Sequence, residues 1–136
     1  MRPLLAAAAA LAGIAAPAAA HADTAFAPPY VDHTQWDQYW GDLTTLRVFP
    51  TPSGRAASAN LQSAEAADEA WSEVLADAPD ADQPGMRAQF LCHWRLAEFA
   101  EPGKVSWNIE PWRPVVSDLQ MIASGCNPGG AEEPNP

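Results

Sequence analysis

Two cysteines, Cys92 and Cys126, restrict the fold of this chain more than any other feature. A bond between them would close a loop of about 35 residues and stabilise the fold by roughly 3.5–4 kcal/mol in a chain-entropy treatment. That is a large share of the stability of a typical domain, which is about 5–15 kcal/mol. Because disulfides persist only in oxidising surroundings, the compartment decides whether this bond forms.

The N-terminus predicts export to such a compartment. Arg2 precedes an uncharged apolar run over residues 4–16, Pro17 interrupts it, and Ala20-His21-Ala22 has the small-x-small pattern that signal peptidase cleaves. The run is too short to cross a bilayer, which needs about 20 apolar residues. We therefore expect a signal peptide over residues 1–22, cleavage after Ala22, and a secreted protein without membrane insertion. In that compartment Cys92 and Cys126 are predicted to form a disulfide bond.

The mature chain is strongly acidic. Without Arg2 it carries 6 basic and 17 acidic residues, and every charged residue between Arg55 and Arg87 is acidic. Such a surface repels phosphate backbones, so we expect no nucleic-acid partner. We interpret the acidic run as a solvated helix face, with a docking face for a basic partner as the alternative.

The core of this protein has to come from aromatic side chains. Leu, Ile, Val and Phe make up only 19 of the 114 mature residues, a fraction as low as in many intrinsically disordered chains. Six tryptophans compensate, since each buries about 150–250 Å². We expect one globular domain over residues 30–129, a mobile arm over 23–29 and a disordered tail over 130–136.

Hydrophobic periodicity predicts an α+β fold in which two or more short antiparallel strands pack with two long helices and one short helix. Strands are expected at 43–49 and 105–109, a loop at 50–54, and no assignment emerges for 30–41. The long helices are expected at 56–78, with Leu61 and Trp71 on its buried stripe, and at 84–100, with Asp82 as its cap. Ser117 and Gln120 match a capping box that opens the short helix, which Gly125 ends.

Candidate catalytic residues are few. His93 with Glu110 is a hypothetical general-base pair, and the alternative is that His93 is a buried packing residue. A zinc site of Cys92, His93, Cys126 and His33 is disfavoured, because adjacent helical residues point about 100° apart. We expect no metal and no cofactor.

The segment Trp107–Pro114 is the most unusual stretch. Its Asn108, Glu110, Trp112 and Arg113 are predicted to form a binding site, in which an exposed Trp112 stacks and Arg113 forms hydrogen bonds. In the alternative, Arg113 pairs with Glu110 and only fixes the end of the strand.

These motifs resemble a family of secreted actinobacterial proteins classed as a domain of unknown function, family 2599. The resemblance covers about Trp36 to Gly129, and the residues that carry it are Leu46–Arg55, Trp71, Met86-x-x-Gln89-x-x-Cys92-His93, Trp107–Pro114 and Cys126-Asn127-Pro128. It implies export and paired cysteines, but no activity, substrate or catalytic residue. The leading hypothesis is a non-catalytic extracytoplasmic module that binds a protein, peptide or glycan. The alternatives are a small secreted hydrolase that uses His93 with a carboxylate and a structural component of the cell envelope.

Overall fold

The computed structural model describes residues 13, 15, 26–38 and 40–132, so the expected signal peptide lies almost entirely outside the described residues. As predicted, the domain is α+β. No helix among the described residues is long and apolar enough to cross a membrane. In chain order the elements are β1 (Val31–Gln38), β2 (Thr44–Pro50), α1 (Pro52–Ser58), α2 (Ala64–Asp77), the 3-10 helix η2 (Pro79–Ala81), α3 (Met86–Ala100), β3 (Trp107–Ile109) and α4 (Asp118–Ala123).

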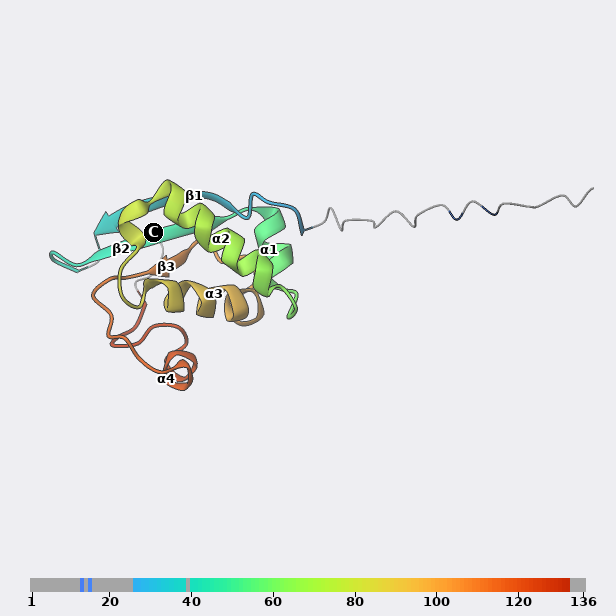
Figure 1. Cartoon of the computed structure of the whole chain (residues 1–136). Coiled ribbons are helices and arrows are strands. Elements are labelled where there is room, and N and C mark those ends of the chain that lie inside the picture. The colour runs from blue at the N-terminus through green and yellow to red at the C-terminus, as the bar shows by residue number, and fades with distance from the viewer. Residues whose placement is uncertain (1–12, 14, 16–25, 39, 133–136) are drawn as a thin grey trace, which may run out of the picture.

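The three strands form an antiparallel sheet in the order β1-β2-β3. Leu46 of β2 lies opposite Ile109 of β3, and Val48 lies opposite Trp107. These four side chains share one face, which is fully buried against α2 and α3. Figure 1 shows α3 running beneath the sheet, with α4 as the outermost element on that side. The alternation of Leu46 and Val48 is therefore confirmed as the core-facing pattern of a strand.

Aromatic rings link the helices to the sheet. The Phe90 ring of α3 lies 5.5 Å from Trp71 of α2 and 6.2 Å from Trp107 of β3, measured between ring centroids. Trp94 meets Trp107 edge to face at 6.0 Å. Trp71 retains only 7% exposure, which confirms its predicted place in the core.

The single helix expected at 56–78 is wrong, because the structure divides it into α1 and α2. The Thr51 side chain accepts a hydrogen bond from the Gly54 amide at 2.9 Å and Pro52 occupies the first turn, so α1 begins inside the segment expected to be a loop. Asn60 then accepts from the Gln62 amide at 3.1 Å, which favours a turn over continued helix. Leu61 lies in this turn and is 86% exposed rather than buried.

Acidic side chains of α2 protect the open edge of the sheet. Glu73 Oε2 accepts from the backbone amides of Tyr30 and Val31, each at 2.7 Å. Asp77 Oδ2 accepts from the Thr34 amide at 2.7 Å, and hydrogen bonding from Thr34 holds the pKa of Asp77 below its ordinary value. The acidic run is thus more than a solvated face, since two of its members occupy donors that would otherwise attract another strand.

The N-termini of α3 and α4 differ in how well they match the caps predicted from the sequence. The expected Asp82 cap is wrong: α3 begins after Gly85, which has a φ of 84° and no side chain to cap the helix. At α4 the capping box of Ser117 and Gln120 is confirmed, with both reciprocal hydrogen bonds present. Gly125 follows α4 in the left-handed region, with a φ of 60°.

The described ends of the chain are bonded to the domain. The Ser53 hydroxyl donates to the Ala27 carbonyl at 2.6 Å and the Thr51 hydroxyl donates to the Pro29 carbonyl at 2.7 Å. At the other end Arg113 donates to the Gly130 carbonyl at 2.6 Å. Three described residues of the segments expected to be an arm and a tail, Ala27, Pro29 and Gly130, thus accept hydrogen bonds from the domain.

Candidate functional site

Glu110 lies at the centre of a buried network at the end of β3. Its backbone N–H donates to Gln89 Oε1 and its carbonyl accepts from Gln89 Nε2, both at 2.9 Å, so one side chain of α3 satisfies both backbone groups. Its carboxylate accepts from the Thr45 hydroxyl at 2.9 Å and from Arg113 Nε at 2.5 Å. The Glu110 side chain is 1% exposed and that of Arg113 is 0% exposed.

Arg113 is buried and bonded to the fold through its Nε and Nη1. Beyond its pair with Glu110, its Nη1 donates to the carbonyls of Pro128 and Gly130 at 3.2 and 2.6 Å. The half-buried Trp112 ring covers the guanidinium, which lies 4.4 Å from the ring centroid. The alternative we weighed, in which Arg113 and Glu110 fix the end of the strand, therefore describes this segment.

The predicted binding site is corrected by these positions. Asn108 is also buried, at 1% exposure, and its Oδ1 accepts from the Ser106 hydroxyl at 2.7 Å. Ser106, Asn108 and Glu110 alternate with apolar residues, as in a half-buried strand, but all three are interior. With Asn108, Glu110 and Arg113 buried, this face of β3 offers a ligand no polar surface.

His93 is buried on the same helix as Gln89. Its Nδ1 donates to the Gln89 carbonyl at 2.9 Å, which leaves the lone pair on Nε2. Burial lowers the pKa of His93, so the ring is neutral near pH 7. The Glu110 oxygens accept from Thr45 and Arg113 and the His93 Nδ1 donates to Gln89, so the hypothetical general-base pair of His93 and Glu110 is not formed among the described residues.

A cavity of about 200 Å³ adjoins His93 and contains Lys104 and Glu132, which form an ion pair. None of its described lining residues is a serine, a threonine or a free thiol, because Cys126 is in a disulfide. The described lining of the cavity thus supplies a neutral imidazole and the paired side chains of Lys104 and Glu132, but no hydroxyl or thiol nucleophile. No group of three His, Cys, Asp or Glu side chains that could hold a metal occurs in the part of the chain that the structure describes.

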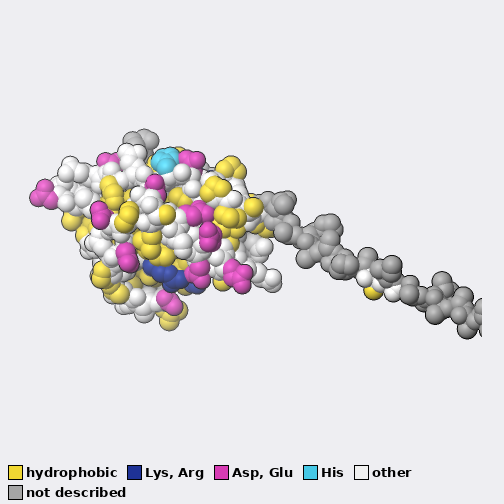
Figure 2. Space-filling model, turned by 45° about the horizontal axis from the view of Figure 1, so that its top comes forward, with side chains coloured by type: hydrophobic (Ala, Val, Ile, Leu, Met, Phe, Trp, Pro, Cys, Tyr) yellow, Lys and Arg dark blue, Asp and Glu magenta, His cyan; other side chains and the backbone are white. Residues whose placement is uncertain are grey.

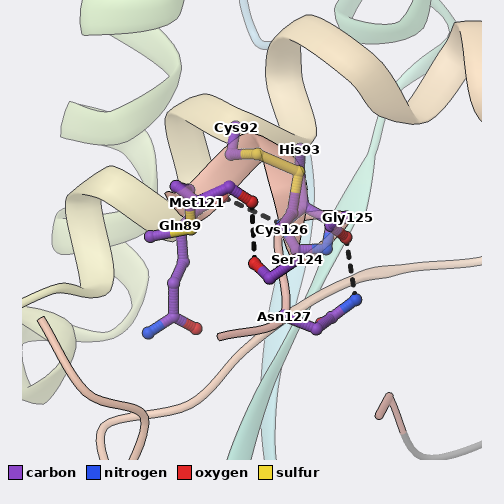
Figure 3. Close-up of a disulfide and its surroundings, with 8 residues drawn as sticks. All are labelled: Gln89, Cys92, His93, Met121, Ser124, Gly125, Cys126 and Asn127. Atoms are coloured by element: carbon purple, nitrogen blue, oxygen red, sulfur yellow. Dashed lines mark hydrogen bonds between the residues drawn. A yellow bond between two sulfur atoms is a disulfide. The ribbon is translucent and has the colours of Figure 1, made fainter. Parts of the chain in front are cut away.

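The predicted disulfide between Cys92 and Cys126 is confirmed, with the two Cα atoms 5.5 Å apart. Figure 3 shows it joining α3 to the loop after α4, where the Cys126 amide donates to the Met121 carbonyl at 3.0 Å. Cys126 has a φ of 69°, a left-handed conformation that is unusual for a residue with a side chain. The bond holds α4 against α3 and so fixes the shape of the surface between them.

The basic side chains divide into two classes. Four are largely buried, with at most 25% of the side chain exposed, and form ion pairs: Arg47 with Asp37, Arg55 with Glu98, Lys104 with Glu132 and Arg113 with Glu110. The remaining two, Arg87 and Arg95, lie on the exposed side of α3. Figure 2 shows basic side chains gathered in one place on the face in view, beside hydrophobic side chains.

Arg87 and Arg95 are the more available cations. Arg87 Nη2 lies 2.6 Å from Asp68 Oδ1, but both side chains are more than half exposed, at 53% and 66%, so the pair is weak. Arg95 is exposed and forms no ion pair within the described residues. The sequence signal was the spacing of Arg87, Leu91 and Arg95 at every fourth position, which places them on one side of a helix.

This side of α3 separates two hollows. One of about 500 Å³ lies between α3 and α4, with Met121 and Ile122 in its wall. The other, of about 610 Å³, lies between α3 and the connection from α1 to α2, with Leu61 in its wall. Both are lined by the same four side chains, which we call the α3 ridge: Arg87, Leu91, Arg95 and Leu96.

The family model described as a protein of unknown function (DUF2599) matches residues 31–129, a span that contains the sheet, the α3 ridge and the disulfide. The chain belongs to the DUF2599 family. This confirms the resemblance found in the sequence.

Two relatives of this DUF2599 protein show how close the similarity is. An uncharacterized protein of Mycobacterium tuberculosis (strain ATCC 25618 / H37Rv) is 63% identical over 106 residues, which cover 78% of this chain and 70% of the relative. An uncharacterized protein of Mycobacterium leprae (strain TN) is 48% identical over 104 residues, which cover 76% of this chain and 83% of the relative. No solved structure matches the DUF2599 chain.

Proposed function

We propose that this protein is an extracytoplasmic, non-catalytic interaction module that binds a polypeptide partner along the α3 ridge. The observation that carries the proposal is that two hollows share this ridge, so a partner laid on α3 would contact both. The signal-peptide pattern of residues 1–22 and the disulfide support the extracytoplasmic part of the proposal.

Apolar side chains around the ridge support a protein contact. Leu61 is 86% exposed, Leu119 is 80% exposed and Ile122 is 55% exposed, and they lie on the elements that flank α3. Exposed apolar groups beside arginines are typical of interfaces. The 15 residues of α3 extend over about 22 Å, a length that suits a polypeptide segment better than a small molecule. Aliphatic and guanidinium groups also suit a polypeptide better than a glycan, which needs exposed aromatic rings to stack on.

The hydrolase alternative has less support. Glu110 is occupied by Thr45 and Arg113. The described residues around the His93 cavity include no hydroxyl or thiol nucleophile, and the Glu132 carboxylate there is paired with Lys104. The alternative of a structural envelope component without a discrete ligand predicts no specific binding on α3. The peptide selection described next therefore distinguishes it from the proposed binding module.

The test is selection from a random peptide display library on the oxidised protein. Ala88 is exposed and lines the hollow between α3 and α4, so Ala88→Trp fills that hollow without replacing a buried residue. Ala76→Trp on the exposed side of α2 is the matched control. We expect selected peptides to bind the wild type and Ala76→Trp but not Ala88→Trp. Peptides that bind all three proteins equally, or the absence of any selected peptide, would contradict the proposal.

A further inference from the structure

The distribution of cations identifies the kind of partner, if the α3 ridge is the binding surface proposed above. In a protein with 17 acidic residues, four of the six basic side chains of the mature chain are largely buried in ion pairs with carboxylates of the fold, and a fifth, Arg87, forms an exposed pair with Asp68. Arg87 and Arg95 are thus the two exposed cations, and both lie on the ridge. We infer that the partner is an acidic segment whose carboxylates meet Arg87 and Arg95 and whose apolar side chains enter the hollows beside them.

The distance between Arg87 and Arg95 on the α3 ridge determines how far apart the carboxylates of the partner segment should lie. Arg87 and Arg95 are eight positions apart, which is about 12 Å along a helix axis, and Leu91 lies midway on the same side. An extended segment covers that distance in about five residues and alternates its side chains between two faces. Its first and fifth residues would then supply carboxylates and its third an apolar side chain opposite Leu91.

Arg95 is the stronger of the two contacts. Arg87 already has the exposed Asp68 as a neighbour, and a partner carboxylate would share or replace that contact. Arg95 forms no ion pair among the described residues, so the carboxylate of the partner would be its first. A guanidinium can bind such a carboxylate through two parallel hydrogen bonds. A basic partner would instead bring a third positive charge next to these two.

The net negative charge of the protein does not cancel this local preference. At physiological ionic strength, charges more than about 8 Å apart are largely screened. The acidic side chains that line the two hollows are Asp68 and Asp118, and Asp68 is the one already paired with Arg87. An arriving carboxylate therefore meets mainly Arg95.

Two peptide libraries test the inference. They share a central leucine and random flanks, and they carry either glutamate or lysine two residues before and two residues after that leucine. We expect the glutamate library to be enriched on the wild-type protein in about 0.15 M salt and the lysine library not to be. For the best glutamate clone, Arg95→Gln should weaken binding about tenfold, the effect of losing one charge-assisted contact.

The matched control is Gln35→Glu, which changes the net charge by the same amount on an exposed position of β1. Its affinity for the clone should stay within about twofold of the wild type. Enrichment of the lysine library, an unchanged affinity in Arg95→Gln, or self-association of the wild type through α3 would overturn the inference. If peptides without carboxylates bind and Ala88→Trp blocks them, the proposed function stands and this inference falls. If nothing binds at α3, both fall.

Discussion

Replacing Arg113 with methionine tests whether the end of β3 is a folding element. The substitution leaves the Glu110 carboxylate in the interior with the Thr45 hydroxyl as its one remaining donor among the described residues. It also removes the donor to the carbonyls of Pro128 and Gly130. Taking one partner from a buried ion pair typically costs about 3–5 kcal/mol, because the other charge stays buried without compensation. We expect a loss of free energy of unfolding in that range.

A double variant separates the charge effect from lost packing. In Glu110→Leu with Arg113→Met no charge remains buried, so the double variant should be more stable than Arg113→Met alone. Arg87→Met is the matched control, since its pair with Asp68 is exposed and worth less than about 1 kcal/mol.

The assay is denaturation of the oxidised proteins, followed by tryptophan fluorescence and extrapolated to zero denaturant. A loss below about 1 kcal/mol for Arg113→Met would refute the reasoning. A double variant as unstable as the sum of the two single variants would refute it as well, because the pair would then show no coupling.

Three further predictions concern the core, the disulfide and His93. Trp71→Ala should destabilise the domain by about 3–5 kcal/mol in denaturant unfolding, and a loss under about 1 kcal/mol would mean that α2 does not pack through this ring. Reduction of Cys92–Cys126 should lower the melting temperature by more than about ten degrees, and an unchanged melting curve would contradict the assigned role of the bond. Because burial lowers the pKa of His93, its contribution to stability is complete above the ordinary value of 6.5 and declines as the pH falls below it. That decline should persist in His33→Gln and disappear in His93→Gln, and a decline that persists in both would exclude His93 as its source.

The periodic elements could be predicted from the sequence, and the breaks between them could not. In β2 the spacing of Leu46 and Val48 predicted the strand and its core-facing side, although Thr45 and Arg47 on the other face are buried as well. In the alanine-rich stretch from Ala56 to Ala78 the helical spacing of apolar residues runs across the turn, so periodicity alone could not locate it, although Ser58, Asn60 and Ser63 are residue types that favour turns and caps. The start of α1 did have a local signal, Thr51 followed by Pro52, which resembles a helix cap as much as a loop.

The candidate site could not be predicted from the sequence for a different reason. Alternation predicts that one face of a strand is polar, but it does not show whether water or the protein covers that face. Around Glu110 the protein covers it, through side chains from α3 and β2 that are 21 and 65 positions away in the sequence. Which arginines remain available depends equally on distant partners, as the pair of Arg55 and Glu98 shows. The α3 ridge could be found only after those contacts were known.

The most direct test of the account is a nuclear magnetic resonance titration of the isotope-labelled, oxidised protein with the best glutamate peptide. The account predicts that backbone amide shifts concentrate at Arg87, Leu91 and Arg95 and on α4, while Trp112 and the end of β3 stay unchanged. Shifts centred on Trp112, or shifts spread evenly over the surface, would contradict the claim that the α3 ridge is where this protein binds its partner.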